Sequence, residues 1–162
     1  MVKILGIDPA LNKTGWGVIS TSNDGTMSYI ASGIIKLQTN YSLPEKIALI
    51  SSAIKEVLTN FNPDQIAIEE TFVNTNPLTS LKLGHARGAI IASCSNFSAP
   101  IYEYGANKIK KTVCGVGKAE KQQVAMMVKV LLPKANFKYD DESDALAVAI
   151  CHLNHHNRAL LN

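Results

Sequence analysis

The chain has 162 residues, of which 46% are hydrophobic, and a formal net charge of +3 at pH 7. This length and composition predict one domain with its own core and exclude a small scaffold that needs disulfides or metals to fold. No apolar run approaches the roughly 18 residues that span a membrane, and the three cysteines form no Cys-x-x-Cys pair, so we expect a protein of a reducing, cytoplasmic compartment.

The N-terminal part of the chain predicts three consecutive strands, which suggest an antiparallel meander. These strands cover residues 2–7, 15–20 and 27–37. Residues 44–61 follow with apolar side chains at helical spacing, and the helix ends before a proline at position 63.

The rest of the chain alternates between strands and helices. The predicted elements are strand 65–68, helix 77–96, strand 100–104, and helices 118–132 and 142–156. A meander followed by this alternation predicts an α/β fold with a mixed five-stranded sheet, covered by helices on both faces. No repeat or linker divides the pattern, so we predict one domain over residues 1–157 and a short tail over 158–162.

Four acids stand at element boundaries, where folding can bring distant residues into one cleft. Asp8 and Glu69 end predicted strands, and Asp141 with Asp144 open the last helix. Ligands of open α/β sheets bind at the carboxyl ends of the strands. Magnesium prefers oxygen ligands, and two such ions about 3.5–4 Å apart can stabilise the attacking and leaving oxygens of a phosphodiester. The four acids therefore indicate a metal-dependent nuclease.

Each of these acids also has a structural interpretation. Asp8 stands before a proline and could simply open a turn. Asp141 and Asp144 have the i, i+3 spacing of a helix cap. Glu69 and Glu70 would point to opposite faces of their strand, and alternation does not choose between them because a strand covered on both faces has no polar side.

Basic residues gather in one part of the chain. Residues 105–138 contain eight lysines and one acid and carry +7, so the remainder carries −4. Such a segment beside an acidic cleft favours a polyanionic substrate, since lysines bind phosphates while carboxylates hold cations. A solvated helix face is the alternative explanation.

Several motifs occur in order over nearly the whole chain, among them Gly-Ile-Asp-Pro and Asp-Glu-Ser-Asp-Ala-Leu-Ala. They occupy residues 6–9, 14–17, 67–72, 81–88, 115–121 and 141–147. Together they resemble the RuvC family of bacterial crossover junction endodeoxyribonucleases. The resemblance implies an RNase H-like fold, a homodimer, and Mg²⁺-dependent symmetric nicking of four-way Holliday junctions. It also implies a branch-migration complex of RuvA and RuvB proteins as a partner.

The resemblance further implies a metal site. Its ligands are Asp8, Glu69, Asp141 and Asp144, and they would hold two Mg²⁺ ions per subunit, which Mn²⁺ can replace. The sequence departs from the family at Ala10, where a glycine is usual. If the backbone there needs a positive φ, alanine would strain the loop beside the first ligand.

The same resemblance implies positions that contact DNA. Lys110 and Lys121 match basic residues near the scissile phosphate, where they could stabilise charge in the transition state or bind the backbone. Lys111 and Lys118 would add phosphate affinity. Phe72 would stack on a base, a contact worth about 1–3 kcal/mol, although an aromatic residue there could also belong to the core.

Small residues recur every four positions on the helix predicted at 77–96. They are Ser80, Gly84, Gly88 and Ala92. They could pack against the domain's own sheet, or they could form an interface with a second copy of the chain. We favour the interface, because resolving a junction needs two related cuts.

The last helix carries a cysteine and three histidines that could hold a metal. These residues are Cys151, His152, His155 and His156. Histidines near a helix C-terminus complement its dipole without any ligand, so we expect no metal there.

Two other functions are consistent with parts of the sequence. A non-catalytic junction-binding module would bind DNA without metal-dependent turnover. An actin-like nucleotide-hydrolysing domain would share the glycines around Asp8 and Thr14, but such enzymes need two lobes and 162 residues supply one.

Overall fold

A five-stranded mixed sheet forms the centre of the computed structural model, which describes residues 1–22, 24–71 and 76–159, with side chains up to residue 156. The strands are β1 (Val2–Asp8), β2 (Lys13–Thr21), β3 (Met27–Lys36), β4 (Gln65–Glu69) and β5 (Ile101–Tyr104). The helices are α1 (Leu43–Phe61), α2 (Pro77–Cys94), α3 (Ala106–Cys114), α4 (Lys121–Leu131) and α5 (Asp140–Ala159).

The strand order is β3-β2-β1-β4-β5. β1, β2 and β3 are antiparallel neighbours, whereas β4 runs parallel to β1 and β5 runs parallel to β4. The predicted fold class is therefore confirmed, and the carboxyl ends of β1 and β4 lie at the same edge of the sheet.

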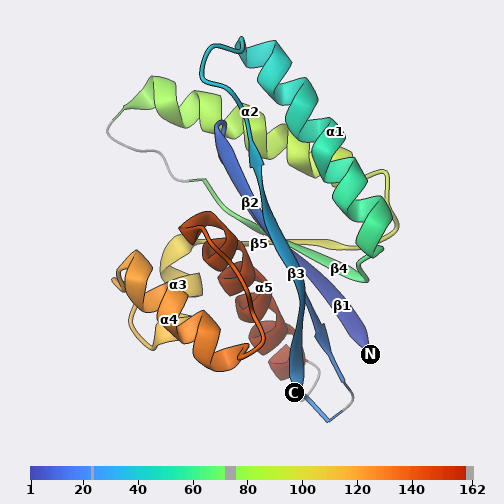
Figure 1. Ribbon diagram of the computed structural model, residues 1–162, viewed down its shortest axis with the longest axis vertical. Helices are drawn as coiled ribbons and strands as arrows, with labels where there is room; N and C mark the ends of the chain where they lie inside the picture. Colours follow the sequence, from blue (N-terminus) through green and yellow to red (C-terminus); the bar gives the residue numbers. More distant parts are fainter. Residues whose placement is uncertain (23, 72–75, 160–162) are drawn as a thin grey trace.

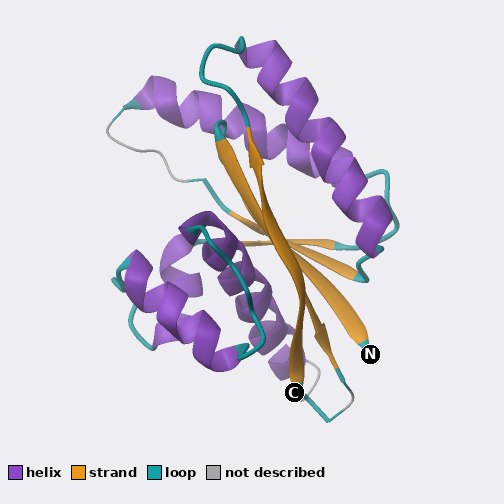
Figure 2. Ribbon diagram, viewed as in Figure 1, coloured by secondary structure: helices purple, strands orange, loops and turns teal. Residues whose placement is uncertain are grey.

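Helices cover both faces of the sheet, with α1 and α2 on one side and α3, α4 and α5 on the other (Figures 1 and 2). Alternate residues of each strand feed the two cores. Leu5 and Ile7 of β1 pack with α1 and α2, while Ile4 packs with α4 and α5. No helix in the described ranges combines the length and apolarity needed to cross a membrane.

α5 lies directly on the backbone of β1 and β2. A Cβ atom on Gly6 would meet the carbonyl oxygen of Ala145 and lie 2.7 Å from the amide nitrogen of Ala149. A Cβ atom on Gly15 would meet the carbonyl oxygen of Asp141. Because these two glycines have no side chains, the first turns of α5 can approach the carboxyl end of β1 and the start of β2.

α3 is the one described helix that the sequence prediction missed. It is nine residues long and lies within the basic segment of residues 105–138. Ile109 and Val113 are buried at i, i+4 spacing, and Gly115 ends the helix in the left-handed conformation with φ of 80°. These three residues are the signal that could have identified α3. The helix predicted at 118–132 begins later, at Lys121, because Glu120 caps it.

Candidate active site

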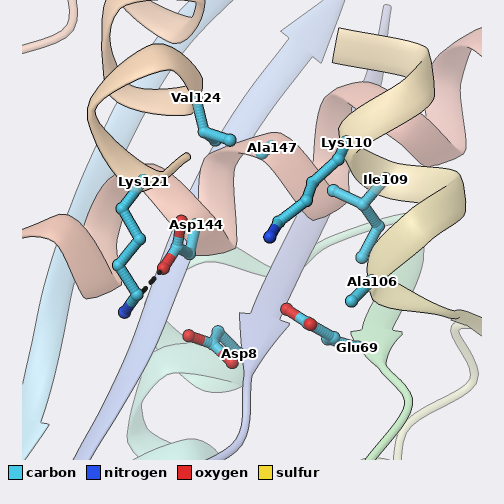
Figure 3. Close-up of a pocket in the computed structure, with 9 residues that line it drawn as sticks. All are labelled: Asp8, Glu69, Ala106, Ile109, Lys110, Lys121, Val124, Asp144 and Ala147. Atoms are coloured by element: carbon cyan, nitrogen blue, oxygen red, sulfur yellow. Dashed lines mark ion pairs between the residues drawn. The ribbon is translucent and has the colours of Figure 1, made fainter. Parts of the chain in front are cut away.

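A cavity of about 210 Å³ opens at the carboxyl ends of β1 and β4, between α3, α4 and α5 (Figure 3). The ends of β1 and β4 supply two acids. The helices α3, α4 and α5 each add one charged side chain and at least one apolar side chain. The lining residues are Asp8, Glu69, Ala106, Ile109, Lys110, Lys121, Val124, Asp144 and Ala147. The structure thus brings three of the four predicted acids and two of the predicted lysines into one site.

The packing of β4 selects Glu69 over its neighbour Glu70. Ile66 and Ile68 belong to the core beneath α1 and α2, whereas Ala67 belongs to the core beneath α5. Because side chains alternate along a strand, Glu69 points to the same face as Ala67, where Asp8 and α5 lie. Glu70 is exposed and lines an adjoining cavity, which Asp8 and Glu69 also line.

The helix cap that Asp141 and Asp144 could have formed is provided by Glu142 instead. One Glu142 carboxylate oxygen accepts hydrogen bonds from the backbone N–H groups of Lys138 and Tyr139, at 2.9 Å and 3.0 Å. The other accepts a hydrogen bond from the Ser32 hydroxyl at 2.9 Å. Asp144 is therefore available to line the cavity. Asp141 does not line it, although its charge contributes to raising the pKa of Asp8.

The three carboxylates in the cavity destabilise one another's charged forms. Burial raises the pKa of Asp8 well above its usual value, and the charges of Glu69 and Asp144 raise it further. Burial and the charge of Asp144 raise the pKa of Glu69 to about 7. Burial also raises the pKa of Asp144, in spite of the opposing effect of Lys121. A bound cation would relieve this repulsion.

Two lysines face these acids from different helices. The Lys121 ammonium lies 3.4 Å from a carboxylate oxygen of Asp144 (Figure 3). Burial lowers the pKa of Lys121, but Asp144 and the other acids outweigh it and raise the pKa overall. Lys110 reaches the cavity from α3 and acts to lower the pKa of Glu69.

The other predicted DNA contacts lie away from the cavity. Lys111 lines a different cavity on the far side of α3, and Lys118 is exposed in the connection between α3 and α4. Phe72 falls outside the described residues, so its stacking on DNA stays a prediction.

The loop that follows Asp8 is unstrained at Ala10. Asn62 is the one residue other than glycine with a positive φ in the described ranges, so Ala10 does not need the conformation that favours glycine. The Thr14 hydroxyl donates a hydrogen bond to the Ala10 carbonyl at 2.5 Å, and the Ala10 N–H donates to the Thr14 hydroxyl oxygen at 3.2 Å. These contacts hold the loop against the start of β2.

The chemistry of the acids fits a hard divalent cation. Carboxylate oxygens are the ligands that Mg²⁺ prefers, and burial together with the repulsion between neighbouring acids raises the pKa of all three carboxyl groups. No three Asp, Glu, His or Cys side chains within the described ranges already converge at metal-binding distance.

The histidines of α5 form a hydrogen-bonded network with β4 and β5. His152 is fully buried, and its Nε2 lies 2.9 Å from the side-chain oxygen of Gln65, to which it donates. Its Nδ1 lies 2.8 Å from the Tyr104 hydroxyl, which therefore donates to it. Burial, helped by His156 and His155, lowers the pKa of His152 to about 4, so the ring is neutral at pH 7. Both ring nitrogens of His152 are engaged in structural hydrogen bonds.

Tyr104→Phe is expected to lower the free energy of unfolding by about 1–3 kcal/mol, because it leaves the buried Nδ1 of His152 without a donor. Tyr102→Phe is the matched control. The Tyr102 ring lies 4.5 Å from the His152 ring, but its hydroxyl makes no hydrogen bond with any described residue. Denaturant unfolding measures both variants, and equal losses would rule out the assigned hydrogen bond as the cause.

Comparison with known proteins identifies the family. The sequence model of the family described as crossover junction endodeoxyribonuclease RuvC matches residues 4–152. The crossover junction endodeoxyribonuclease RuvC of Agrobacterium fabrum is 43% identical over 157 residues, which cover 97% of this chain and 91% of that protein.

Solved structures agree with the sequence match. T. thermophilus RuvC in complex with Holliday junction substrate has a TM-score of 0.89 and 28% identity, covering 98% of this chain and 97% of that one. The yeast mitochondrial Holliday junction resolvase, at a TM-score of 0.66 and 15% identity, covers 96% of this chain and 83% of its own and shows the fold alone. These matches confirm the predicted RNase H-like fold and junction-resolving nuclease function and lend no support to the alternatives. The chain belongs to the RuvC family of crossover junction endodeoxyribonucleases.

Proposed function

We propose that the protein resolves four-way DNA junctions by paired symmetric nicks, with divalent metal ions bound at the cavity between β1, β4 and α5. The observation that carries this proposal is that Asp8, Glu69 and Asp144 line one cavity together with two lysines. Mutually repelling carboxylates in a desolvated site are costly unless cations neutralise them.

Asp8, Glu69 and Asp144 would hold the ions, and Asp141 would complete the set from the first turn of α5. When bound, two Mg²⁺ ions supply an activated water and stabilise the departing 3′ oxygen, which gives 5′-phosphate and 3′-hydroxyl ends. Mn²⁺ has the same preference for oxygen ligands and would replace Mg²⁺.

The two lysines of the cavity would act on the scissile phosphate. Lys121 neutralises Asp144 in the protein alone, and its ammonium group becomes available to the phosphate once a cation occupies the carboxylates. Lys110 approaches from the opposite wall, on α3 (Figure 3). Preorganised cations around a phosphoryl group stabilise the charge that develops in the transition state.

The cavity between β1, β4 and α5 holds about 210 Å³ and is lined mainly by charged residues and small apolar ones. It has room for ions, water and one phosphate group, while the rest of the DNA would lie outside it.

A homodimer would supply the two related cuts, and α2 offers a surface for it. Gly84 and Gly88 are exposed, and a Cβ atom on either would meet nothing within 4 Å. Packing inside the protomer therefore does not require these glycines. Leu78 and Leu81 on the same helix are each 60% exposed. RuvA and RuvB proteins are the partners that family membership suggests for loading such a dimer.

Gly88→Leu is expected to convert the dimer into monomers, because the new side chain would separate two helices that approach closely at this position. The substitution should not destabilise the protomer, since leucine favours a helix more than glycine does. Light scattering coupled to size-exclusion chromatography measures the mass. Gln122→Leu places the same side chain on α4, across the sheet, and should leave the dimer intact; a dimeric Gly88→Leu protein would contradict this interface.

The proposed activity is tested with a labelled four-way junction and a linear duplex of identical sequence, each incubated with the protein in EDTA, Mg²⁺ or Mn²⁺. Symmetric nicks in the junction alone, and only with metal, are expected. Tight junction binding without nicks in either metal would instead establish a binding module.

A further inference from the structure

α3 separates two cavities and presents lysines to both. Lys110 points into the catalytic cavity (Figure 3), whereas Lys108 and Lys111 line a second cavity of about 360 Å³ on the other side of the helix. Thr112 of α3 and residues of α5 complete this second cavity. Residues at i, i+3 and i+4 share one face of a helix, which explains why Lys108, Lys111 and Thr112 lie together.

The second cavity is positively charged and lacks an acid. Its lining consists of Lys108, Lys111, Thr112, Asn154 and His155. Residues 145–159 of α5 contain no Asp or Glu, and neither do residues 106–114 of α3. The ion pairs in the described part of the chain involve neither Lys108 nor Lys111. The charge of these two lysines is therefore not neutralised within the site.

Thr112, Asn154 and His155 in the lining of the cavity already form hydrogen bonds. The Thr112 hydroxyl donates to the Lys108 carbonyl at 2.8 Å and lies 3.1 Å from Nε2 of His155. The Asn154 amide donates to the Ile150 carbonyl at 2.9 Å. Lys108 also lies with its ammonium group 5.0 Å from the centre of the Tyr104 ring, which restricts where it can reach. These hydrogen bonds hold the lining of the cavity in place, and the ammonium groups of Lys108 and Lys111 are the groups that can bind a ligand there.

An extended polyanion that enters the catalytic cavity would pass over α3 to reach the second cavity. A helix with its side chains is about 10–12 Å across. The far side of α3 is therefore within reach of a phosphate a few nucleotides away from the scissile one.

We propose that Lys108 and Lys111 form a second phosphate-binding site, which holds the backbone of the cleaved strand a few nucleotides from the cut. This inference rests on the proposed junction-resolving function. A phosphate bound there would fix the direction in which the strand leaves the catalytic cavity, because Lys110 and this pair contact it on opposite sides of one helix.

The first test measures the salt dependence of junction binding for a Lys108→Ala, Lys111→Ala double variant. Fluorescence anisotropy in EDTA between 50 and 200 mM salt is expected to show at least about tenfold weaker binding. The slope of log affinity against log salt should fall by about one for each lysine removed per bound subunit. Lys134→Ala with Lys138→Ala removes equal charge from exposed positions of the same basic segment. Equal losses in both double variants would mean general attraction and would overturn the site.

The second test locates the phosphate. Single methylphosphonates, which are uncharged, replace backbone phosphates at one to six nucleotides on either side of the cut. A substitution at one of these positions should weaken binding of the wild-type protein but not of the Lys108→Ala, Lys111→Ala variant. Absence of such coupling at every position would refute the inference. If the wild-type protein neither binds nor cuts the unmodified junction, the proposed function fails instead.

Discussion

Asp8→Asn is expected to abolish junction cleavage while making the metal-free protein more stable. Asn has the shape of Asp but cannot neutralise a cation, so the cleavage rate should fall by at least about 10²–10³-fold, the range seen when one charge-stabilising group is removed. Stability should rise because the substitution removes a buried charge that Glu69 and Asp144 repel. Single-turnover cleavage in Mg²⁺ and thermal unfolding in EDTA measure the two effects.

Asp140→Asn is the matched control for this prediction. Asp140 is an exposed acid at the start of α5 and does not line the catalytic cavity. Its removal changes the net charge by the same amount and should leave the cleavage rate within about threefold of wild type, since exposed charges interact weakly. An Asp8→Asn protein that cuts at the wild-type rate would show that Asp8 serves the fold and not the chemistry.

The stability of the metal-free protein is expected to fall as the pH rises from about 4.5 to about 7. Glu69 has a pKa of about 7 in the folded protein, against a usual value of 4.5. Between these values the unfolded chain loses a proton that the folded protein keeps, so rising pH favours unfolding. The full shift corresponds to about 3 kcal/mol, and below pH 4.5 the effect of Glu69 vanishes because both states are protonated. The raised pKa values of Asp8 and Asp144 act in the same direction.

Affinity for Mg²⁺ should change in the opposite direction over the upper part of this range. Cations bind the deprotonated carboxylates, so affinity should rise up to about tenfold per pH unit for each proton released and level off above about pH 7. Denaturant unfolding in EDTA at pH 5, 6, 7 and 8, with Mg²⁺ titrations at the same values, tests both trends. Glu69→Gln should flatten the stability profile; an unchanged profile would assign the titration to another group.

The sequence predicted the sheet and its acidic edge because both depend on local patterns. Apolar runs identified β1 and β4, and the rule that ligands bind at strand carboxyl ends placed Asp8 and Glu69 together. Alternation could not choose between Glu69 and Glu70, since β4 is buried on both faces. From the sequence, only the resemblance to the RuvC family selects Glu69. The physical reason is the packing of Ala67 beneath α5, which places Glu69 on the same face of β4.

The parts that the sequence could not predict depend on contacts between distant elements. Asp141 and Asp144 have the spacing of a helix cap, but α5 begins at Asp140, and it is Glu142 that accepts hydrogen bonds from the backbone before the helix and from Ser32 on β3. The lysines of α3 looked like one basic run, yet the turn of that helix divides them between two cavities. In both cases the sequence gives the right kind of residue, and only the fold determines which neighbour it meets.

The glycines beneath α5 determine the distance between the carboxylates that this helix and β1 contribute to the cavity. At Gly6 and Gly15 the backbone of α5 contacts the backbone of β1 and β2 directly. This backbone contact, more than the side-chain rotamers, sets the distance between Asp144 and Asp8. A methyl group at either position would push α5 away from the sheet and lengthen the distance between Asp8 and Asp144 that a cation must bridge. A longer carboxylate would then have to make up the difference, so bulk at position 6 or 15 and the length of the acid at position 144 cannot vary independently in a working enzyme.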